Sequence, residues 1–225
     1  MLSTAEPGPR RFPFIVFDWD GTLIDSTSII ADSLQQACRD VGEPMPTDIA
    51  ARYVIGLGLS DALKHVAPGL PSNRYAELAA RYRHHFVARD AQMKLYPGAR
   101  GLLAELASAG FLLGIATGKS RAGLDRALAQ QRLEGLFAAT RCADEGFPKP
   151  HPDMLEQLMD RVGVAPHETL MIGDTTHDIE LARNAGAAAL AVAYGAHHAD
   201  GLDALAPLAT LHSIAELRAW LIANA

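Results

Sequence analysis

The chain has 225 residues, of which 49% are hydrophobic and 20% are charged. This composition is typical of one large globular domain, or of a domain with an insert, and it is too apolar for a disordered chain. Twenty Lys and Arg residues against 26 Asp and Glu residues give a net charge of −6. That balance argues against a nucleic-acid partner, because such binding relies on basic residues that neutralise phosphates. A small anionic substrate remains compatible, since a local pocket can be positive on an acidic protein.

The cysteines and the N-terminal segment indicate the compartment. Cys38 and Cys142 have no metal or redox spacing, and we expect both to be buried free thiols in a reducing cytoplasm. Residues 1–13 lack the apolar core of a signal peptide, and no apolar stretch is long enough to span a bilayer. The sequence therefore predicts a cytoplasmic protein without a membrane partner, and it is compatible with both a monomer and a homodimer.

Short apolar runs alternate with helical patterns along most of the chain. Short continuous apolar runs, here of three to six residues, favour parallel strands that are covered on both faces. The predicted strands are Phe14–Phe17, Phe111–Ala116, Ala138–Cys142, Leu170–Ile172 and Ala189–Val192. The predicted helices are Ala99–Ala109, Ser120–Gln130, Pro152–Val162 and Asp178–Ala185. This alternation predicts an α/β fold with a Rossmann-like, doubly wound parallel sheet.

One long stretch interrupts the alternation. Residues 25–96 contain no convincing strand, but apolar side chains recur there at helical spacing, as at Ile30, Leu34 and Cys38. The stretch is much longer than a normal connection between a strand and a helix. We therefore expect an α/β core formed by residues 1–24 and 97–225, with an inserted α-helical subdomain at residues 25–96.

Two acidic motifs follow two of the predicted strands. Asp18–Thr22 (DWDGT) comes directly after the first strand, and Gly173–Asp178 (GDTTHD) comes directly after Leu170–Ile172. In an open parallel sheet, chemistry is located at the carboxyl ends of the strands. A cluster of hard carboxylate oxygens at this edge is the kind of site that attracts Mg²⁺. For Asp178, capping of the following helix is an equally good explanation.

A hydroxyl group and a lysine follow two further strands. Thr117–Lys119 (TGK) provides a hydroxyl and backbone N–H groups at a predicted helix start, which is a suitable site for an anion. Lys149 is flanked by two prolines after the strand Ala138–Cys142. A cation held beside an acidic cluster can bind a phosphate and offset the carboxylates. Each motif alone has an ordinary structural explanation, but the four together, each after a strand, indicate one site.

This order of motifs resembles the haloacid-dehalogenase-like hydrolase superfamily, and the resemblance extends over the chain from Phe12 onward. The run Phe17–Ser26 (FDWDGTLIDS) is similar to the phosphoglycolate-phosphatase-like branch, in which a helical cap follows the first strand. The resemblance implies that residues 25–96 form such a cap. It also implies a phosphatase that acts on a small phosphorylated metabolite, either phosphoglycolate-like or a sugar phosphate.

The family resemblance implies a role for each matching residue. Asp18 would attack phosphorus and form an aspartyl-phosphate, while Asp20 would protonate the leaving oxygen and then activate water. Mg²⁺ would be held by the carboxylates of Asp18 and Asp174 and by the backbone carbonyl of Asp20, and Asp178 would orient the metal shell or the lysine. The residues that would bind the phosphate are Gly21, Thr22, Thr117, Gly118 and Lys149.

The motifs leave two other functions open. A phosphosugar mutase of the same fold carries both acids, and a regulator that accepts a phosphoryl group without turnover would use the same acidic cluster. Phosphonoacetaldehyde hydrolases also have Trp after the nucleophile, but they lack the second acid and use a cap lysine, for which Lys64 is the candidate here. The residues that could set cap specificity are Arg52, Gly56, Gly58 and Lys64. The paired histidines His84–His85 and His197–His198 have no metal spacing, and we expect them at the surface.

Overall fold

The computed structural model describes residues 10–225. The first nine residues, which belong to the expected core segment 1–24 and to the segment inspected for a signal peptide, lie outside this range. The core is a six-stranded sheet in the order β5-β4-β1-β6-β7-β8, and every pair in it is parallel. Its strands are β1 Phe14–Phe17, β4 Leu112–Thr117, β5 Ala139–Cys142, β6 Thr169–Gly173, β7 Ala188–Val192 and β8 Thr210–Leu211.

Helices cover both faces of this sheet, as a doubly wound fold requires. Along β1, Ile15 and Phe17 belong to a cluster that includes side chains of α5, α6 and α10, whereas Phe14 and Val16 pack with side chains of α7 and α8. Alternate side chains of a strand point to opposite faces, so the uniformly apolar β1 is buried on both sides. The core helices are α5 Ala99–Ser108, α6 Arg121–Gln131, α7 Asp153–Val162, α8 Thr176–Asn184, α9 Ala199–Asp203 and α10 Ile214–Asn224.

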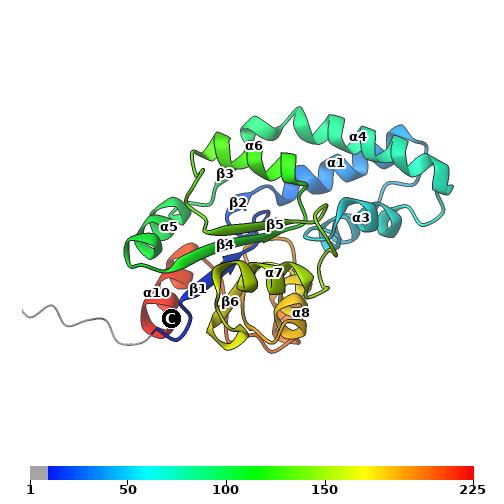
Figure 1. Cartoon of the computed structure of the whole chain (residues 1–225). Helices are drawn as coiled ribbons and strands as arrows, with labels where there is room; N and C mark the ends of the chain where they lie inside the picture. Colours follow the sequence, from blue (N-terminus) through cyan, green and yellow to red (C-terminus); the bar gives the residue numbers. More distant parts are fainter. Residues whose placement is uncertain (1–9) are drawn as a thin grey trace, which may run out of the picture.

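The segment between the first two core strands is helical. We call residues 26–93 the helical insert; a short antiparallel pair, β2 Ile24–Asp25 with β3 Lys94–Leu95, joins its two ends. Figure 1 shows its helices grouped beyond the carboxyl ends of β4 and β5, at the opposite end of the molecule from α10 and the C-terminus. The helices of the insert are α1 Thr27–Asp40, α2 Asp48–Tyr53, α3 Leu59–Val66 and α4 Tyr75–Val87.

The predicted strands and helices agree with the structure to within two residues at each end. Three short strands and the two C-terminal helices, α9 and α10, had not been predicted. β2, β3 and β8 have two residues each. A run of two residues has no recognisable periodicity, so only pairing with a distant segment defines such strands. α8 begins at Thr176, two residues before the expected start, because Thr175 and Asp178 form a capping box around its first turn.

Both cysteines are buried and unpaired, as predicted. Burial raises the pKa of Cys38 to about 11 and that of Cys142 to about 12, so both thiols stay protonated at neutral pH. Within residues 10–225, every helix is too short or too polar to cross a bilayer.

Candidate active site

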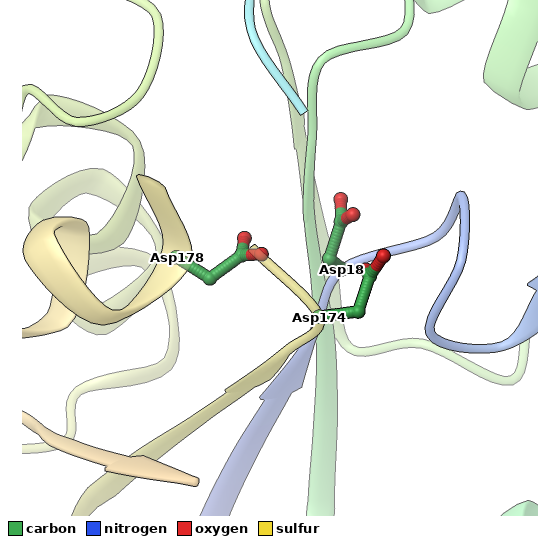
Figure 2. Close-up of side chains that lie close together, drawn as sticks. All are labelled: Asp18, Asp174 and Asp178. Atoms are coloured by element: carbon green, nitrogen blue, oxygen red, sulfur yellow. The ribbon is translucent and has the colours of Figure 1, made fainter. Parts of the chain in front are cut away.

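The predicted acids meet at the carboxyl edge of the sheet. Asp18 follows β1, and Asp174 follows β6, which is the neighbour of β1. In Figure 2 the carboxylate of Asp178 points from the first turn of α8 toward those of Asp18 and Asp174. One carboxylate oxygen from each of the three residues lies within 4.8 Å of the others, and all three side chains are buried. The structure thus brings two motifs separated by more than 150 residues of sequence into a single acidic cluster.

A buried lysine lies beside this cluster. The ammonium group of Lys149 donates to Asp18 Oδ1 at 2.8 Å and to Asp178 Oδ1 at 2.5 Å, and its side chain is fully inaccessible to solvent. Burial alone lowers the pKa of Lys149, but Asp178 and Asp18 outweigh it, so the net pKa lies above the usual value. Lys149 is therefore a permanent positive charge next to Asp18.

The two oxygens of Asp178 are both occupied by protein donors. Oδ1 accepts from Lys149, and Oδ2 accepts from the backbone N–H of Thr175 at 3.0 Å and from its hydroxyl at 2.7 Å. The helix cap and the ion pair thus use the same carboxylate. Of the two roles left open for Asp178, the contacts favour orientation of Lys149.

Asp174 is held by donors from two other loops. Its Oδ1 accepts from the Thr22 hydroxyl and its Oδ2 accepts from the backbone N–H of Ala196, both at 2.7 Å. A Cβ atom at Gly21 would lie 2.1 Å from Asp174 Oδ2, and one at Gly195 would lie 2.2 Å from the same atom. Both positions therefore need glycine. The Thr22 hydroxyl, which belongs to the group of residues expected to bind phosphate, donates its hydrogen bond to the Asp174 carboxylate.

The cluster fits a divalent cation. Asp18 Oδ2 is buried and has no hydrogen-bond partner among residues 10–225. Burial raises the pKa of Asp18 to about 7, an effect that Lys149 opposes and the charge of Asp178 increases. Burial, together with the charges of Asp18 and Asp178, raises the pKa of Asp174 as well. A bound cation would offset this excess of negative charge, and carboxylate oxygens are the ligands that Mg²⁺ prefers.

Asp20 lies in a different environment from Asp18. Its Oδ1 accepts from the Ser26 hydroxyl at 2.7 Å, and its Oδ2 is 3.0 Å from Lys119 Nζ. The Lys119 ammonium also lies 4.6 Å from the centre of the Phe86 ring on α4, so the contact with Asp20 is covered by the helical insert. In the sequence, Lys119 was included in the motif Thr117–Lys119 but was assigned no role. Its position two residues after Thr117 was the one feature of the sequence that pointed to the site.

The loop after β4 lies under the helical insert. Thr117 is buried, and its hydroxyl accepts from the backbone N–H of Lys119 at 3.2 Å. A Cβ atom at Gly118 would lie 2.5 Å from the carbonyl oxygen of Leu57 and 2.7 Å from that of Gly56. Gly118 therefore permits a close approach of the insert backbone to the core.

The four residues that were candidates for cap specificity have different surroundings in the structure. Gly56 lies near Thr175, and its φ of +92° explains why glycine is needed; Gly58 lies near Pro148. Arg52 donates to the hydroxyls of Thr27 and Ser28 and to Asp48, so it ties α2 to the start of α1. The side chain of Lys64 is 61% exposed, and its ammonium lies 3.6 Å from Asp61 in the same helix. Its position gives no support to a lysine-based mechanism.

The expectation of surface histidines is wrong for His197. This side chain is half-buried, and its Nδ1 accepts from the backbone N–H of Thr176 at 3.1 Å. The reason is that the loop after β7 turns back toward α8, which carries His177. Burial lowers the pKa of both His177 and His197. Of the other pair, His84 is exposed and His85 is 2.7 Å from Asp40.

Comparisons with known proteins agree with this arrangement. The family model described as haloacid dehalogenase-like hydrolase matches residues 15–192. The chain is 35% identical over 211 residues to the protein named probable phosphatase IndB from Dickeya dadantii, covering 91% of each chain. It is 32% identical over 228 residues to a phosphoglycolate phosphatase from Vibrio vulnificus, covering 92% of this chain and 95% of that protein.

A solved structure supports the fold over nearly the whole length. A hydrolase from Pseudomonas syringae has a TM-score of 0.86 and 22% sequence identity, and the match covers 96% of this chain and 99% of that one. At this identity the likeness concerns the fold alone. Together with the family match, it leads to one assignment. The chain belongs to the haloacid dehalogenase-like hydrolases and lies in their phosphoglycolate-phosphatase-like branch.

Proposed function

We propose that this protein is a Mg²⁺-dependent phosphatase that hydrolyses a small phosphomonoester through an aspartyl-phosphate on Asp18. One observation carries the proposal: Asp18 Oδ2 is buried and has no hydrogen-bond partner in the described part of the chain, while Oδ1 of the same carboxylate is held by Lys149 at 2.8 Å. A carboxylate oriented through one oxygen and free at the other is arranged for attack on an electrophile. The buried lysine beside it favours an anionic electrophile such as a phosphoryl group.

In the first step the free oxygen of Asp18 attacks phosphorus, and the bond from phosphorus to the ester oxygen breaks. The leaving alkoxide needs a proton, and Asp20 is the candidate donor because it lies two residues away with a separate set of partners, Ser26 and Lys119. In the second step the proton moves in the opposite direction: Asp20 accepts a proton from water, and this water attacks the phosphorus of the aspartyl-phosphate. Inorganic phosphate leaves, and the Asp18 carboxylate is restored.

Charge neutralisation is the main requirement of phosphoryl transfer. Lys149 supplies a fixed positive charge at Asp18, and the Thr117 hydroxyl, which lies at the end of β4, is a further donor for the phosphoryl oxygens. When bound, Mg²⁺ would be held by the carboxylates of Asp18 and Asp174 and by the Asp20 carbonyl, and it would add positive charge for the phosphoryl oxygens. Thr22 and the N–H of Ala196 keep Asp174 in place for that role.

The helical insert and its flanking residues, together the segment 25–96 expected from the sequence, are proposed to act as a cap. Phe86 of α4 covers the Lys119 ammonium, and the backbone of Gly56 and Leu57 comes close to Gly118. A cap in this position would exclude water from the reacting groups and reopen to release product. Such an enclosed site favours a small phosphorylated metabolite, either phosphoglycolate-like or a sugar phosphate.

The test is release of inorganic phosphate from a panel of phosphomonoesters, with Mg²⁺ and with a chelator. The panel contains 2-phosphoglycolate, sugar phosphates, nucleotides and an aryl phosphate. We expect metal-dependent release that falls at least about a thousandfold in Asp18→Asn, while the variant keeps its fold. Phosphate that migrates within a sugar instead of being released would identify a mutase. A stable aspartyl-phosphate without turnover would identify a regulator.

A further inference from the structure

An aromatic cluster joins the helical insert to the core beside the active site. Tyr53, the last residue of α2, packs against two core histidines, His177 in the first turn of α8 and His197 in the loop after β7. Its ring is stacked on His197 with a centroid distance of 5.4 Å and an interplanar angle of 5°, and it meets His177 edge-on at 5.4 Å. The two imidazoles also contact each other edge-on at 5.3 Å. We call these three residues the Tyr53 cluster.

Both histidines of the cluster contact the same backbone atom. The carbonyl oxygen of Tyr53 lies 2.9 Å from His177 Nε2 and 3.1 Å from His197 Nε2. A carbonyl can only accept, so both imidazoles donate from Nε2. For His197 the other nitrogen agrees with this tautomer, because Nδ1 accepts from the Thr176 N–H. The last carbonyls of a helix lack intrahelical donors, and here two side chains of the core provide them.

The chain that leaves the Tyr53 cluster lies directly on the loops of the active site. Residues 54–58, which we call loop 54–58, pass over three strand ends of the core. Gly56 lies against Thr175 after β6, Gly58 lies against Pro148 after β5, and the carbonyls of Gly56 and Leu57 lie against Gly118 after β4. The position of loop 54–58 therefore determines how much space remains above the acidic cluster.

We propose that His177 and His197 are positioning residues that hold loop 54–58 closed over the active site and so restrict the site to small phosphomonoesters. The substrate part of this inference rests on the proposed function. The contact is made to the backbone of Tyr53 at the point where loop 54–58 begins, so it determines the path of the loop whatever side chains the loop carries. His177 also lies next to Asp178 in the first turn of α8, so the element that orients Lys149 also anchors the loop.

The first test follows the loop itself and does not depend on turnover. Hydrogen–deuterium exchange is measured at the amides of loop 54–58 in the full-length protein and in the double variant His177→Ala/His197→Ala. Loss of two hydrogen bonds and of the ring contacts should accelerate exchange in this loop by about tenfold or more. Two variants serve as controls that should leave exchange unchanged: His198→Ala at an exposed neighbouring histidine, and Tyr53→Phe, which keeps both the ring and the carbonyl.

A second variant displaces the loop from its other side. Gly118→Ala would place a Cβ atom 2.5 Å from the Leu57 carbonyl, so it should accelerate exchange in loop 54–58 while both histidines remain. In both variants the ratio of kcat/KM for 2-phosphoglycolate to that for a bulky aryl phosphate should fall by about tenfold, because the opened loop admits the larger ester.

The outcomes separate this inference from the proposed function. Unchanged exchange in the folded double variant would overturn the positioning role of the histidines. Faster exchange with an unchanged substrate ratio would overturn the link to specificity. A wild-type protein that hydrolyses no phosphomonoester would instead overturn the proposed function, and the exchange experiment would still decide whether the histidines anchor the loop.

Discussion

The ammonium group of Lys149 lies 2.5 Å from Oδ1 of Asp178, and the other oxygen of that carboxylate caps α8 through Thr175. The first turn of a helix thus orients the lysine that contacts Asp18. Because Lys149 is buried between two carboxylates, its charge is balanced inside the protein rather than by water. The stability of the core and the charge of the active site therefore depend on the same ion pairs.

Removal of the lysine charge should destabilise the protein. Lys149→Met leaves Asp18 and Asp178 buried without their cation, and breaking a buried ion pair in this way costs about 3–5 kcal/mol. The measurement is urea unfolding in the presence of a chelator. Lys64→Met is the control, because Lys64 is exposed and pairs only loosely with Asp61; its effect should stay within about 0.5 kcal/mol. Equal effects of the two substitutions would contradict the buried pairing.

The pKa of Asp18 predicts a pH-dependent stability in the absence of metal. Burial raises this pKa from 3.8 to about 7 in the folded protein. Between these values the folded state binds a proton that the unfolded state has lost, so the free energy of unfolding decreases as the pH rises through this window. Asp18→Asn has no such proton, so we expect its melting temperature to rise relative to the wild type between pH 4 and pH 8.

The comparison is made by calorimetry with a chelator present. A difference in melting temperature that stays constant with pH would show that Asp18 does not titrate in this window. Addition of Mg²⁺ at pH 8 should stabilise the wild type more than Asp18→Asn, because the metal offsets a carboxylate charge that only the wild type has.

The sequence was sufficient to predict five of the six strands of the sheet and the acids at its edge. Strands such as β6 are continuous apolar runs, and residues after parallel strands meet at one edge whatever their separation in the chain. This rule places Asp18 and Asp174 together without knowledge of any other contact. The same reasoning located Lys149, since it follows β5.

Contacts between the helical insert and the core could not be predicted in this way. The approach of Lys119 to Asp20 and the packing of Tyr53 on His197 depend on how the insert lies over the sheet. The hydrophobic periodicity of the sequence does not indicate how the insert is oriented on the sheet. His197 was expected at the surface because the His197–His198 pair has no metal spacing, and its burial follows from the packing of α2 against the loop after β7.

Gly195 should be essential for the geometry of Asp174. In Gly195→Ala the new Cβ atom would lie 2.2 Å from Asp174 Oδ2, so the carboxylate must move and its bond to the Ala196 N–H is disturbed. Loss of a group that orients a metal ligand typically weakens metal affinity by about 10- to 100-fold. Isothermal titration with Mg²⁺ measures this change. Gly201→Ala is the control, because its Cβ atom meets nothing within 4 Å. A similar loss of Mg²⁺ affinity in Gly201→Ala would contradict a specific role of Gly195.

Asp20→Asn should separate formation of the aspartyl-phosphate from its hydrolysis. Asparagine cannot accept a proton from water, so dephosphorylation should slow by about 10²- to 10⁴-fold. With an aryl phosphate, whose leaving group needs little protonation, the first step should continue and phosphorylated protein should accumulate. Mass spectrometry of the acid-quenched protein would detect one phosphoryl group, and peptide mapping should place it on Asp18. Asp32→Asn is a matched control, since this exposed aspartate pairs with Arg89 within the insert. Turnover of Asp20→Asn at the wild-type rate would exclude Asp20 as the acid–base group and assign its contacts with Ser26 and Lys119 to structure alone.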